Sequence, residues 1–229
     1  MFVSEIFHSI QGEGKLSGLP SVFIRTSGCN LRCTWCDTPY ASWDPVGQEV
    51  HVDEIVDRVK SFACRHVVLT GGEPVIASGI VELAAQLRVT GHHVTVETAA
   101  TVFKNIGMDL ASLSPKLSNS TPLTRAGGRF AESHDHLRLN VDAIQAFIDT
   151  SPEFQLKFVI SQHEDLAEVN DLLRRLTRWQ ASDVLLMPEG VDDAVLAERA
   201  TWLAEICKLH GYRYCSRLHV ALYGNRRGT

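Results

Sequence analysis

Three cysteines, Cys29, Cys33 and Cys36, stand within the eight residues CNLRCTWC. A redox dithiol would need only the last two and would leave the first unexplained. A structural zinc ion normally takes four protein ligands and a catalytic one takes three and a water, and the nearest candidates for a fourth, His8 and His51, stand at no familiar zinc spacing. An iron–sulfur cube usually takes four cysteines. With three, one iron would keep an open position, where a substrate or cofactor could bind directly.

Two further stretches combine backbone freedom with polar groups. In TGGEP, residues 70–74, the glycines let the backbone approach a ligand without interference from a Cβ atom, and a carbonyl group could accept a hydrogen bond from an ammonium group, so Gly72 is the candidate contact. Glu73 is expected to brace this loop rather than to bind a ligand. In SPK, residues 114–116, Lys116 is suited to a carboxylate or a ribose oxygen. Taken alone, the first stretch could be a plain turn and the lysine a surface residue.

Helices and strands must position these stretches. Along the chain, the spacing of apolar residues alternates between a pattern typical of strands and one typical of helices. Short β-branched runs predict strands, and apolar residues three and four apart predict helices. Strands are expected at residues 21–26, 66–70, 93–98, 110–114, 154–160 and 184–187, and helices at 52–62, 80–89, 141–148, 164–176 and 194–210. The segment 116–135 is expected to be a loop, and the tail 212–229 to begin like a strand and to end irregularly.

Strands that alternate with helices predict an α/β fold with a largely parallel sheet. About six such units are too few for the eightfold barrel, so a partial barrel or an open doubly wound sheet remains. In either fold, ligands gather at the carboxyl ends of the strands. The polar loops that follow the predicted strands therefore belong to one rim, which we expect to be the site. These loops are residues 29–36, 71–74, 97–98, 114–116 and 187–190.

Composition and charge limit the class of protein. The chain has 229 residues, a formal net charge of −5 and a pI near 6.0, which argues against broad electrostatic capture of nucleic acid or of an anionic membrane. No window has the roughly 18 apolar residues of a membrane span, and the first residues lack the basic and apolar regions of a signal peptide. A cytoplasmic protein of one domain, residues 1–229, is expected. Disulfides are rare in that compartment, so clustered cysteines indicate metal binding or chemistry.

The order C-x3-C-x2-C, with Trp35 just before the third cysteine, resembles the signature of the radical S-adenosylmethionine superfamily. The resemblance implies a partial (βα)6-type barrel that is trimmed in its helices. It also implies a 4Fe–4S cluster on Cys29, Cys33 and Cys36, whose open position is filled by S-adenosylmethionine through the amino and carboxylate groups of its methionine part. Electron transfer from the reduced cluster would then break a carbon–sulfur bond and give a 5′-deoxyadenosyl radical.

A wider set of residues resembles the 7-carboxy-7-deazaguanine synthase family within that superfamily. The set spans nearly the whole chain: EIFHSIQGEG (5–14), Arg25, CDTPY (36–40), TGGEP (70–74), ETAAT (97–101), SPK (114–116) and LHVALYGNRRG (218–228). It implies ring contraction of 6-carboxy-5,6,7,8-tetrahydropterin to 7-carboxy-7-deazaguanine with release of ammonia, in queuosine and deazapurine biosynthesis. The radical would take a hydrogen from C6 of the substrate and return it after rearrangement, so S-adenosylmethionine would be regenerated. No catalytic side chain is expected beyond the cluster and the cofactor radical.

The same resemblance assigns roles to residues. A pterin edge presents donors and acceptors, which suit the amide of Gln11 and the carboxylate of Glu13, and Arg25 offers a planar fork for the substrate carboxylate. The family's magnesium position, a hydroxyl after Cys-Asp, falls on Thr38, which taken alone could be a helix cap before Pro39. The expected substrate contacts are Ile10, Gln11, Gly12, Glu13, Arg25, Thr70 and His219, the last on a strand-like stretch. The expected S-adenosylmethionine contacts are Trp35, Cys36, Asp37, Gly72, Glu97, Ser114, Pro115, Lys116 and Met187.

Partners follow from the same resemblance. An external electron donor such as a flavodoxin would reduce the cluster, the assembly would be a homodimer, and the tail 212–229 would close over the site. Neither nucleic acid nor a membrane is expected as a partner. The main alternative is a radical activase that installs a glycyl radical on a partner protein; it should lack the pair formed by residues 11–14 and Arg25 and would need an exposed docking surface. A redox-sensing regulatory module is a second alternative, which would leave these loops without a purpose.

Overall fold

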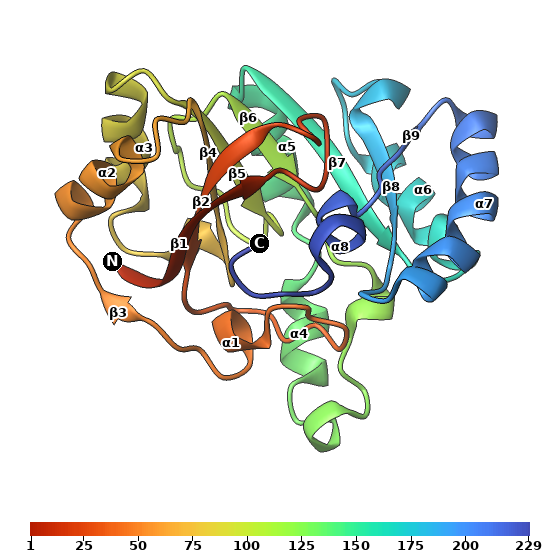
Figure 1. The fold of residues 1–229 in the computed structure, drawn as a ribbon. Helices are drawn as coiled ribbons and strands as arrows, with labels where there is room; N and C mark the ends of the chain where they lie inside the picture. Colours follow the sequence, from red (N-terminus) through yellow and green to blue (C-terminus); the bar gives the residue numbers. More distant parts are fainter.

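A single mixed sheet forms the centre of the molecule (Figure 1). The computed structural model describes residues 1–229. Nine strands follow one another in the order β3-β1-β2-β4-β5-β6-β7-β8-β9. β1 pairs antiparallel with both of its neighbours, whereas all pairings from β2 to β9 are parallel. The strands are β1 (Phe2–Ile10), β2 (Pro20–Thr26), β3 (Gln48–Glu49), β4 (His66–Gly71), β5 (His93–Thr98), β6 (Leu110–Leu113), β7 (Glu153–Ile160), β8 (Val184–Pro188) and β9 (Arg213–Tyr214).

Helices connect the parallel strands and cover the outer side of the sheet. Figure 1 shows α2 (Val52–Lys60) and α3 (Ile80–Val89) at one end, α5 (Val141–Thr150) and α6 (Asp165–Arg175) behind the strands, and α7 (Asp193–His210) at the other end. No helix lies between β5 and β6. The six strands β2, β4, β5, β6, β7 and β8 therefore form a partial barrel that is trimmed in its helices, as the sequence predicts.

Three shorter helices lie elsewhere. They are α1 (Pro39–Ser42), α4 (Ala131–Leu137) and α8 (Leu218–Tyr223). In Figure 1, α8 and the C-terminus lie in front of the sheet, on the side away from α5 and α6, while α4 extends below it. None of the helices combines the length and the apolar composition needed to cross a lipid bilayer.

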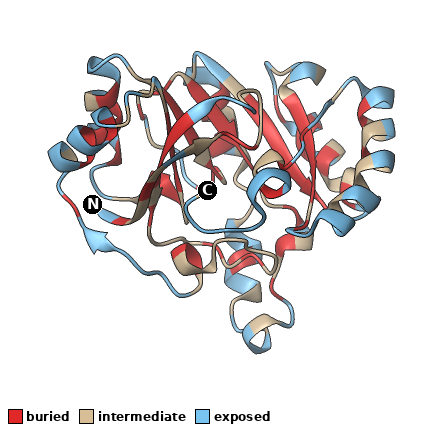
Figure 2. Cartoon of the chain, in the orientation of Figure 1, coloured by how far each residue is buried: buried red, intermediate tan, exposed pale blue.

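The core lies between the parallel strands and the outer helices (Figure 2). Every parallel strand from β2 to β8 contributes fully buried apolar side chains, because both of its faces are covered. Ile24 of β2, Leu69 of β4 and Phe158 of β7 are 0% exposed, as are Leu83 of α3 and Phe147 of α5, which pack against the sheet. This continuous burial is why short apolar runs without alternation predicted these strands correctly.

β1 is a strand that the sequence pattern misses. Its buried apolar residues, Val3 and Ile6, are three apart rather than two, because the pairing with β2 shifts register between Val3 and Glu5. An irregularity of this kind moves the following side chains to the opposite face and removes the simple alternation that marks a strand.

Two predictions on the last part of the chain are wrong. The segment 116–135, expected to be a loop, contains the start of α4, and the only fully buried side chain of that helix is His134, so no apolar periodicity announces it. The tail, expected to continue irregularly after a strand-like start, contains α8, in which only Val220 is buried. Both helices are short, so their own helix propensity is too weak to hold them. Contacts with the rest of the protein stabilise them.

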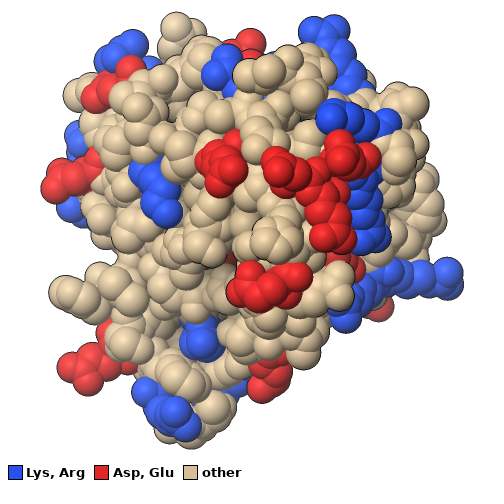
Figure 3. Space-filling model, turned by 90° about the vertical axis from the view of Figure 1, so that its left-hand side faces the viewer, with Lys and Arg blue, Asp and Glu red and all other residues tan.

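Charged side chains of both signs are intermingled on the side of the molecule formed by α2 and α3 (Figure 3). This mixture fits the small net charge of −5.

Candidate active site

A cavity of about 730 Å³ lies at the carboxyl ends of the parallel strands. Its wall includes residues from all five loops that the sequence assigned to one rim, together with the residues after β1 and the C-terminal segment. Of the predicted site residues, those that line the cavity are Ile10, Gln11, Gly12, Glu13, Arg25, Cys29, Cys33, Trp35, Cys36, Asp37, Thr38, Thr70, Gly72, Glu97, Ser114, Lys116, Met187 and His219. Pro115 is the one exception: it is buried behind the wall between two lining residues.

The cysteine loop brings three thiols to one side of this cavity. Cys33 is 8% exposed, and Cys29 and Cys36 are half-buried. Burial raises the pKa of the Cys29 and Cys33 thiols to about 12, so both are protonated at neutral pH in the absence of a bound group. Iron and zinc bind thiolates, so the free energy of binding must include removal of these protons.

The donor set fits an iron–sulfur cluster better than a zinc ion. Nowhere in the protein do three His, Cys, Asp or Glu side chains converge closely enough to hold a single metal ion. No protein side chain supplies a fourth ligand to the three cysteines, and the cavity beside them is large enough for a cluster and a cofactor. Cys29, Cys33 and Cys36 are therefore the residues that would hold a cluster with one open iron.

Two consecutive glycines set the position of the cysteine loop. Gly71 ends β4 with φ +147°, in a region that favours glycine, and an added Cβ would lie 2.3 Å from the carbonyl oxygen of Thr26. A Cβ on Gly72 would lie 2.2 Å from the carbonyl oxygen of Gly28. The sequence suggested that these glycines allow a ligand to approach. In the structure, the packing of β4 against β2 and the cysteine loop requires their missing side chains.

We expect Gly72→Ala to displace the cysteine loop. Its Cβ would meet the backbone oxygens of Gly28 and Ala41, at 2.2 and 2.4 Å, neither of which can rotate away. Overpacking of this kind destabilises a protein by about 1–3 kcal/mol. Thermal unfolding and the iron content after reconstitution would both fall. Gly107→Ala is the matched control, because its Cβ would meet only the flexible end of Arg88, and a Gly72→Ala protein with unchanged stability and iron content would contradict the account.

Glu73 braces this rim, as predicted. Its buried carboxylate accepts hydrogen bonds from the hydroxyl of Thr98 (2.6 Å) and the backbone N–H groups of Ala99 (2.8 Å) and Val75 (3.1 Å). Burial raises the pKa of Glu73 against the effect of these donors. Glu73 does not line the cavity; it joins the loop after β4 to the loop after β5.

The predicted cofactor contacts form one wall. Lys116 Nζ donates to the backbone oxygen and the hydroxyl of Ser114, both at 2.8 Å, and lies 5.9 Å from the centre of the Trp35 ring. Met187 packs with Trp35 in a small apolar cluster on the inner side of β8. Lys116 has no carboxylate partner in the protein, so its charge is available to an anionic group in the cavity.

Glu97 lies between the predicted cofactor and substrate sides. One carboxylate oxygen accepts a hydrogen bond from Gln11 Nε2 (3.1 Å) and the other from the hydroxyl of Thr70 (3.1 Å). The side-chain oxygen of Gln11 accepts the backbone N–H of Glu13, at 3.1 Å. Three segments far apart in the sequence are thereby fixed in one hydrogen-bond network.

A buried ion cluster surrounds Glu13. Its carboxylate pairs with Lys157 and with Arg217, whose Nε lies 3.2 Å away, and His219 Nε2 is 4.0 Å from it. Burial raises the pKa of Glu13, but the charges of Lys157 and Arg217 outweigh burial and hold it well below its usual range. Burial lowers the pKa of His219, so this ring is neutral at pH 7. Glu13 is therefore an ionised acceptor inside the cavity.

Arg217 connects four segments of the site. It pairs with Glu13 in the loop after β1 and with Asp37 in the cysteine loop, and its Nη1 donates to the backbone oxygen of Gly190 after β8, at 2.5 Å. Only 7% of Arg217 is exposed. Burial lowers its pKa, yet the two carboxylates raise it overall. The residue directly precedes α8, so it holds the C-terminal segment on the cavity.

That segment forms part of the cavity wall. His219 lies on α8 rather than on a strand-like stretch, and it packs so closely on Gly12 that an added Cβ would lie 2.0 Å from its Nδ1. The backbone N–H of Leu218 donates to the carbonyl oxygen of Gly12, at 2.9 Å. The five residues Asn225 to Thr229 also line the cavity.

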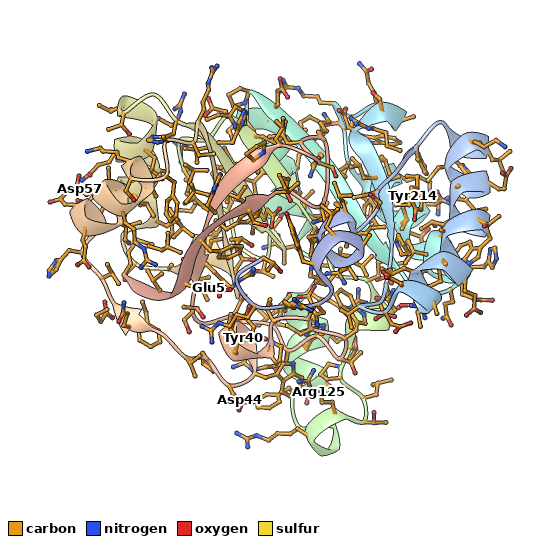
Figure 4. All side chains as sticks on the ribbon, in the orientation of Figure 1. Glu5, Tyr40, Asp44, Asp57, Arg125 and Tyr214 are labelled. Carbon is orange, nitrogen blue, oxygen red and sulfur yellow. The ribbon has the colours of Figure 1, made fainter.

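A second charged group, centred on Glu5, lies beside the cavity, and the three residues that bind Glu5 line it. Glu5 accepts from Arg25 Nε (2.7 Å), from the Tyr40 hydroxyl (2.9 Å) and from Arg227 Nε (3.0 Å). Figure 4 shows Glu5 and Tyr40 facing each other between β1 and α1. Arg25 also lies over the ring of Phe7, 5.7 Å from its centre. Because Glu5 engages only Nε of Arg25, the two terminal nitrogens of that guanidinium group remain available to a ligand.

The hydroxyl of Thr38 contacts only the sulfur of Cys36. This residue precedes α1 at the N-cap position with proline next, as the alternative reading of the sequence required, but its side chain makes no capping hydrogen bond. Its hydroxyl lies in the cavity wall, 3.8 Å from the sulfur of Cys36. A neutral oxygen next to the cysteines suits a hydrated magnesium ion, which needs few protein ligands.

Several members of the site were not predicted from the sequence. Lys157 and Arg217 supply its buried cations. Phe7 and Tyr40 line the cavity, and Glu5 supports the wall through its contacts with Arg25 and Tyr40. Lys157 is the one charged residue inside the apolar run FQLKFVI of β7, and a charge in a strand buried on both faces is a signal that could have been used. Arg217 stands in a tail without a periodic pattern, and nothing local identifies it.

Comparisons with known proteins place the chain among characterised families. A model of the radical SAM superfamily matches residues 23–193. The chain is 46% identical to 7-carboxy-7-deazaguanine synthase of Rhodopirellula baltica, over 100% of this chain and 89% of that protein. It is 45% identical to 7-carboxy-7-deazaguanine synthase of Halobacterium salinarum, over 99% of this chain and 92% of that protein. The crystal structure of QueE from Escherichia coli shares the fold, with a TM-score of 0.71, 22% identity and coverage of 95% and 94% of the two chains.

Proposed function

We propose that this chain, which belongs to the 7-carboxy-7-deazaguanine synthase family of the radical SAM superfamily, converts 6-carboxy-5,6,7,8-tetrahydropterin to 7-carboxy-7-deazaguanine and ammonia. It is a radical SAM enzyme with a 4Fe–4S cluster and S-adenosylmethionine as cofactors. The observation that carries the proposal is that the family's cysteines and the predicted substrate residues line one cavity, at full-length identities of 45–46% to relatives of that name.

When bound, the cluster and S-adenosylmethionine would together supply the radical chemistry that takes a hydrogen atom from the substrate. The cysteines Cys29, Cys33 and Cys36 would hold the cluster, and the wall made by Trp35, Ser114, Lys116 and Met187 would hold the cofactor. The unpaired ammonium of Lys116 suits the cofactor's carboxylate or ribose oxygens.

The substrate side is suited to a pterin with a carboxylate. Glu13 is held ionised, so it can accept hydrogen bonds from the ring N–H and amino groups, and Gln11 presents an amide beside it. The free end of the Arg25 guanidinium group would receive the substrate carboxylate in a bidentate geometry. A magnesium ion held by Thr38 near that carboxylate would share its charge. These residues bind and orient the substrate; they carry no proton in the chemical step.

An anaerobic assay tests the proposed reaction. Reconstituted protein would be supplied with dithionite, magnesium, S-adenosylmethionine and 6-carboxytetrahydropterin, and the products would be separated by mass spectrometry. Formation of 7-carboxy-7-deazaguanine only in the presence of S-adenosylmethionine is the expected result. Unchanged substrate in a protein that carries its full complement of iron would refute the assignment of substrate.

We expect Arg25→Lys to weaken substrate binding more than it slows the reaction. Lysine keeps the charge but cannot make the paired hydrogen bonds of a guanidinium group. Loss of a charge-assisted hydrogen bond, about 1.5–3 kcal/mol, would raise KM for the pterin roughly 10- to 100-fold. The conversion of S-adenosylmethionine to 5′-deoxyadenosine without substrate would be unchanged. An equal fall in that conversion would instead place Arg25 in the support of the cluster.

The activase alternative is not favoured. The loop at residues 11–14 and Arg25, which an activase should lack, are both present; residues 11–13 and Arg25 line the cavity, and so does the C-terminal segment. A small-molecule substrate fits such a site better than a segment of a partner protein does.

The proposal also covers the reductant, the location, the assembly and the C-terminal tail. The reaction needs a strong one-electron reductant, which we take to be a flavodoxin in the cytoplasm. The assembly would be a homodimer. Each chain would form a single domain, in which the tail 212–229 covers the site. The support for these assignments is the family resemblance. Analytical ultracentrifugation of the purified protein would test the assembly.

A further inference from the structure

Arginines stacked on aromatic rings cover the outer side of the cysteine loop. Arg125 lies over the ring of Trp43, 4.1 Å from its centre, and Arg129 and Arg32 lie over Phe130, at 4.8 and 5.5 Å. The two rings meet edge to face, with centres 5.6 Å apart. We refer to Arg32, Trp43, Arg125, Arg129 and Phe130 as the arginine patch. Its members come from the cysteine loop, the end of α1 and the segment before α4.

The arginine patch touches the backbone of the cluster ligands. The indole N–H of Trp43 donates to the carbonyl oxygen of Cys33, at 3.0 Å, and Arg32 Nη1 donates to that of Cys29, at 2.6 Å. Arg125 Nη1 donates to the carbonyl oxygen of Thr34, at 2.9 Å. The loop therefore has one side toward the cavity and the other toward the patch, and only one layer of backbone separates the two.

The charges of the arginine patch are not neutralised within the protein. The side-chain hydrogen bonds of Arg32 and Arg125 go to carbonyl oxygens, Arg129 is exposed, and none of the three forms an ion pair. Of the nearby carboxylates, Asp135 is paired with Arg138, while Asp44 and Glu132 are exposed at the edges. Figure 4 shows Asp44 below α1 and Arg125 next to α4, both in the lower part of the view.

Further cations lie on the other side of α1. Arg227 lies over the ring of Tyr40, 4.4 Å from its centre, and Arg226 is exposed. Both aromatic rings of the short segment 39–43 thus carry an arginine. In a chain with a net charge of −5, the surface around the cysteine loop is locally rich in cations. An acidic protein that approaches this enzyme would be drawn to that surface and repelled elsewhere.

We propose that the arginine patch is the docking surface for an acidic one-electron donor protein, which reduces the cluster through the cysteine loop. The proposal rests on the proposed function, since only a cluster that must be reduced needs such a partner. The cavity side of the loop is occupied by cofactor and substrate during catalysis, so the donor must approach from the outer side. One electron leaves the donor and enters the cluster, and no covalent bond forms or breaks in that step.

The composition of the patch supports a protein partner. Arginine and tryptophan are enriched among the residues that dominate binding energy at protein interfaces. Guanidinium groups that lack a carboxylate can pair with those of a partner without first breaking an ion pair of their own. The exposed side chain of Leu123, 73% accessible, adds an apolar contact on the same segment.

Arg129→Glu is the variant that tests this surface. The guanidinium group of Arg129 lies over the ring of Phe130 and Arg129 does not line the cavity, so the cluster should be retained. Arg65→Glu is the matched control, because Arg65 is also exposed but precedes β4, at the opposite ends of the strands. The probe is an acidic flavodoxin. Its affinity for each protein would be measured at low salt from its flavin fluorescence, and its fully reduced form would then replace dithionite as the reductant in the product assay.

We expect Arg129→Glu to weaken flavodoxin binding roughly tenfold and to raise the flavodoxin concentration for half-maximal rate by the same factor. The dithionite-driven rate and the iron content should match the wild type, and Arg65→Glu should behave as wild type in both measurements. Equal affinities for all three proteins, or equal losses in both variants, would overturn the docking surface. If dithionite produced no 7-carboxy-7-deazaguanine in the wild type, the proposed function would fail, while the affinities would still decide the docking surface on their own.

Discussion

We expect Cys33→Ala to abolish formation of 7-carboxy-7-deazaguanine and to remove most of the iron binding. Cys33 is the most buried of the three thiols in the cavity wall, and no His, Asp or Glu side chain is placed to replace it as a ligand. A cluster left with two cysteines would lose both iron affinity and the geometry that leaves a single iron open. The product should fall below detection in the anaerobic assay, and the absorbance and paramagnetic signal of the reduced cluster should disappear.

The matched control for this variant is Cys64→Ala. Cys64 is half-buried, donates only to the backbone oxygens of Pro20 and His66, and lies outside the cavity. Its replacement should leave iron content and product formation near those of the wild type. A Cys33→Ala protein that kept four irons per chain and made product would show that the cluster is held elsewhere.

Glu13→Gln should destabilise the fold by about 3–5 kcal/mol, the typical cost of removing one partner from a buried ion pair. Lys157, 5% exposed, depends on this carboxylate for its neutralisation, and Arg217, 7% exposed, shares it with Asp37 as a second partner. Glutamine is close in size to glutamate, so the loss would be of charge rather than of packing. Urea denaturation of the cluster-free proteins at neutral pH would measure it.

A second substitution isolates the electrostatic cause. Lys157→Met in the Glu13→Gln background removes the cation that lost its only carboxylate partner, and it should recover part of the lost stability. Lys157→Met alone should be less harmful than Glu13→Gln, because Arg217 still pairs with the carboxylate. If the double variant were as unstable as the sum of the two single variants, the ion cluster would not be the source of the effect.

The stability of the folded protein should depend on pH because of the same Glu13 carboxylate. The pKa of Glu13 in the folded protein is below its ordinary value of 4.5, so the folded protein holds this group ionised where the unfolded chain begins to protonate it. Its contribution to stability is complete above about pH 4.5 and declines as the pH falls toward the folded value. The difference in stability between wild type and Glu13→Gln should therefore shrink below that pH.

Much of the fold was predictable because its central strands are buried on both faces. α3 begins and ends where its apolar period does, at residues 80 and 89, and the glycines after α3 and α7 mark their ends. The elements that escaped prediction carry little apolar periodicity: β1 has a register irregularity, α4 buries a histidine, and α8 buries one valine. Their positions are set by contacts between distant segments, which a local pattern does not contain.

The candidate site likewise has a part that the sequence predicts and a part that it does not. The cysteines and the loops after the strands could be assigned to one rim, because parallel strands bring their carboxyl ends together. The buried charged residues of that rim could not be predicted, because their partners are distant in the sequence. Lys157 and Glu13 are 144 residues apart, and Arg217 and Asp37 are 180 residues apart. The explanation for the glycines at positions 71 and 72 also needed coordinates, since the atoms that exclude a Cβ belong to the backbone of other segments.

The ratio of 7-carboxy-7-deazaguanine to 5′-deoxyadenosine is the measurement that tests the central claim most directly. Wild-type protein with its cluster, dithionite and magnesium would be incubated anaerobically with S-adenosylmethionine and 6-carboxytetrahydropterin, and both compounds would be quantified over time. A ring-contracting enzyme that regenerates its cofactor should yield the deazaguanine in large excess over 5′-deoxyadenosine and over enzyme. Accumulation of 5′-deoxyadenosine without the deazaguanine would leave the radical chemistry standing, contradict the substrate, and return the activase to first place.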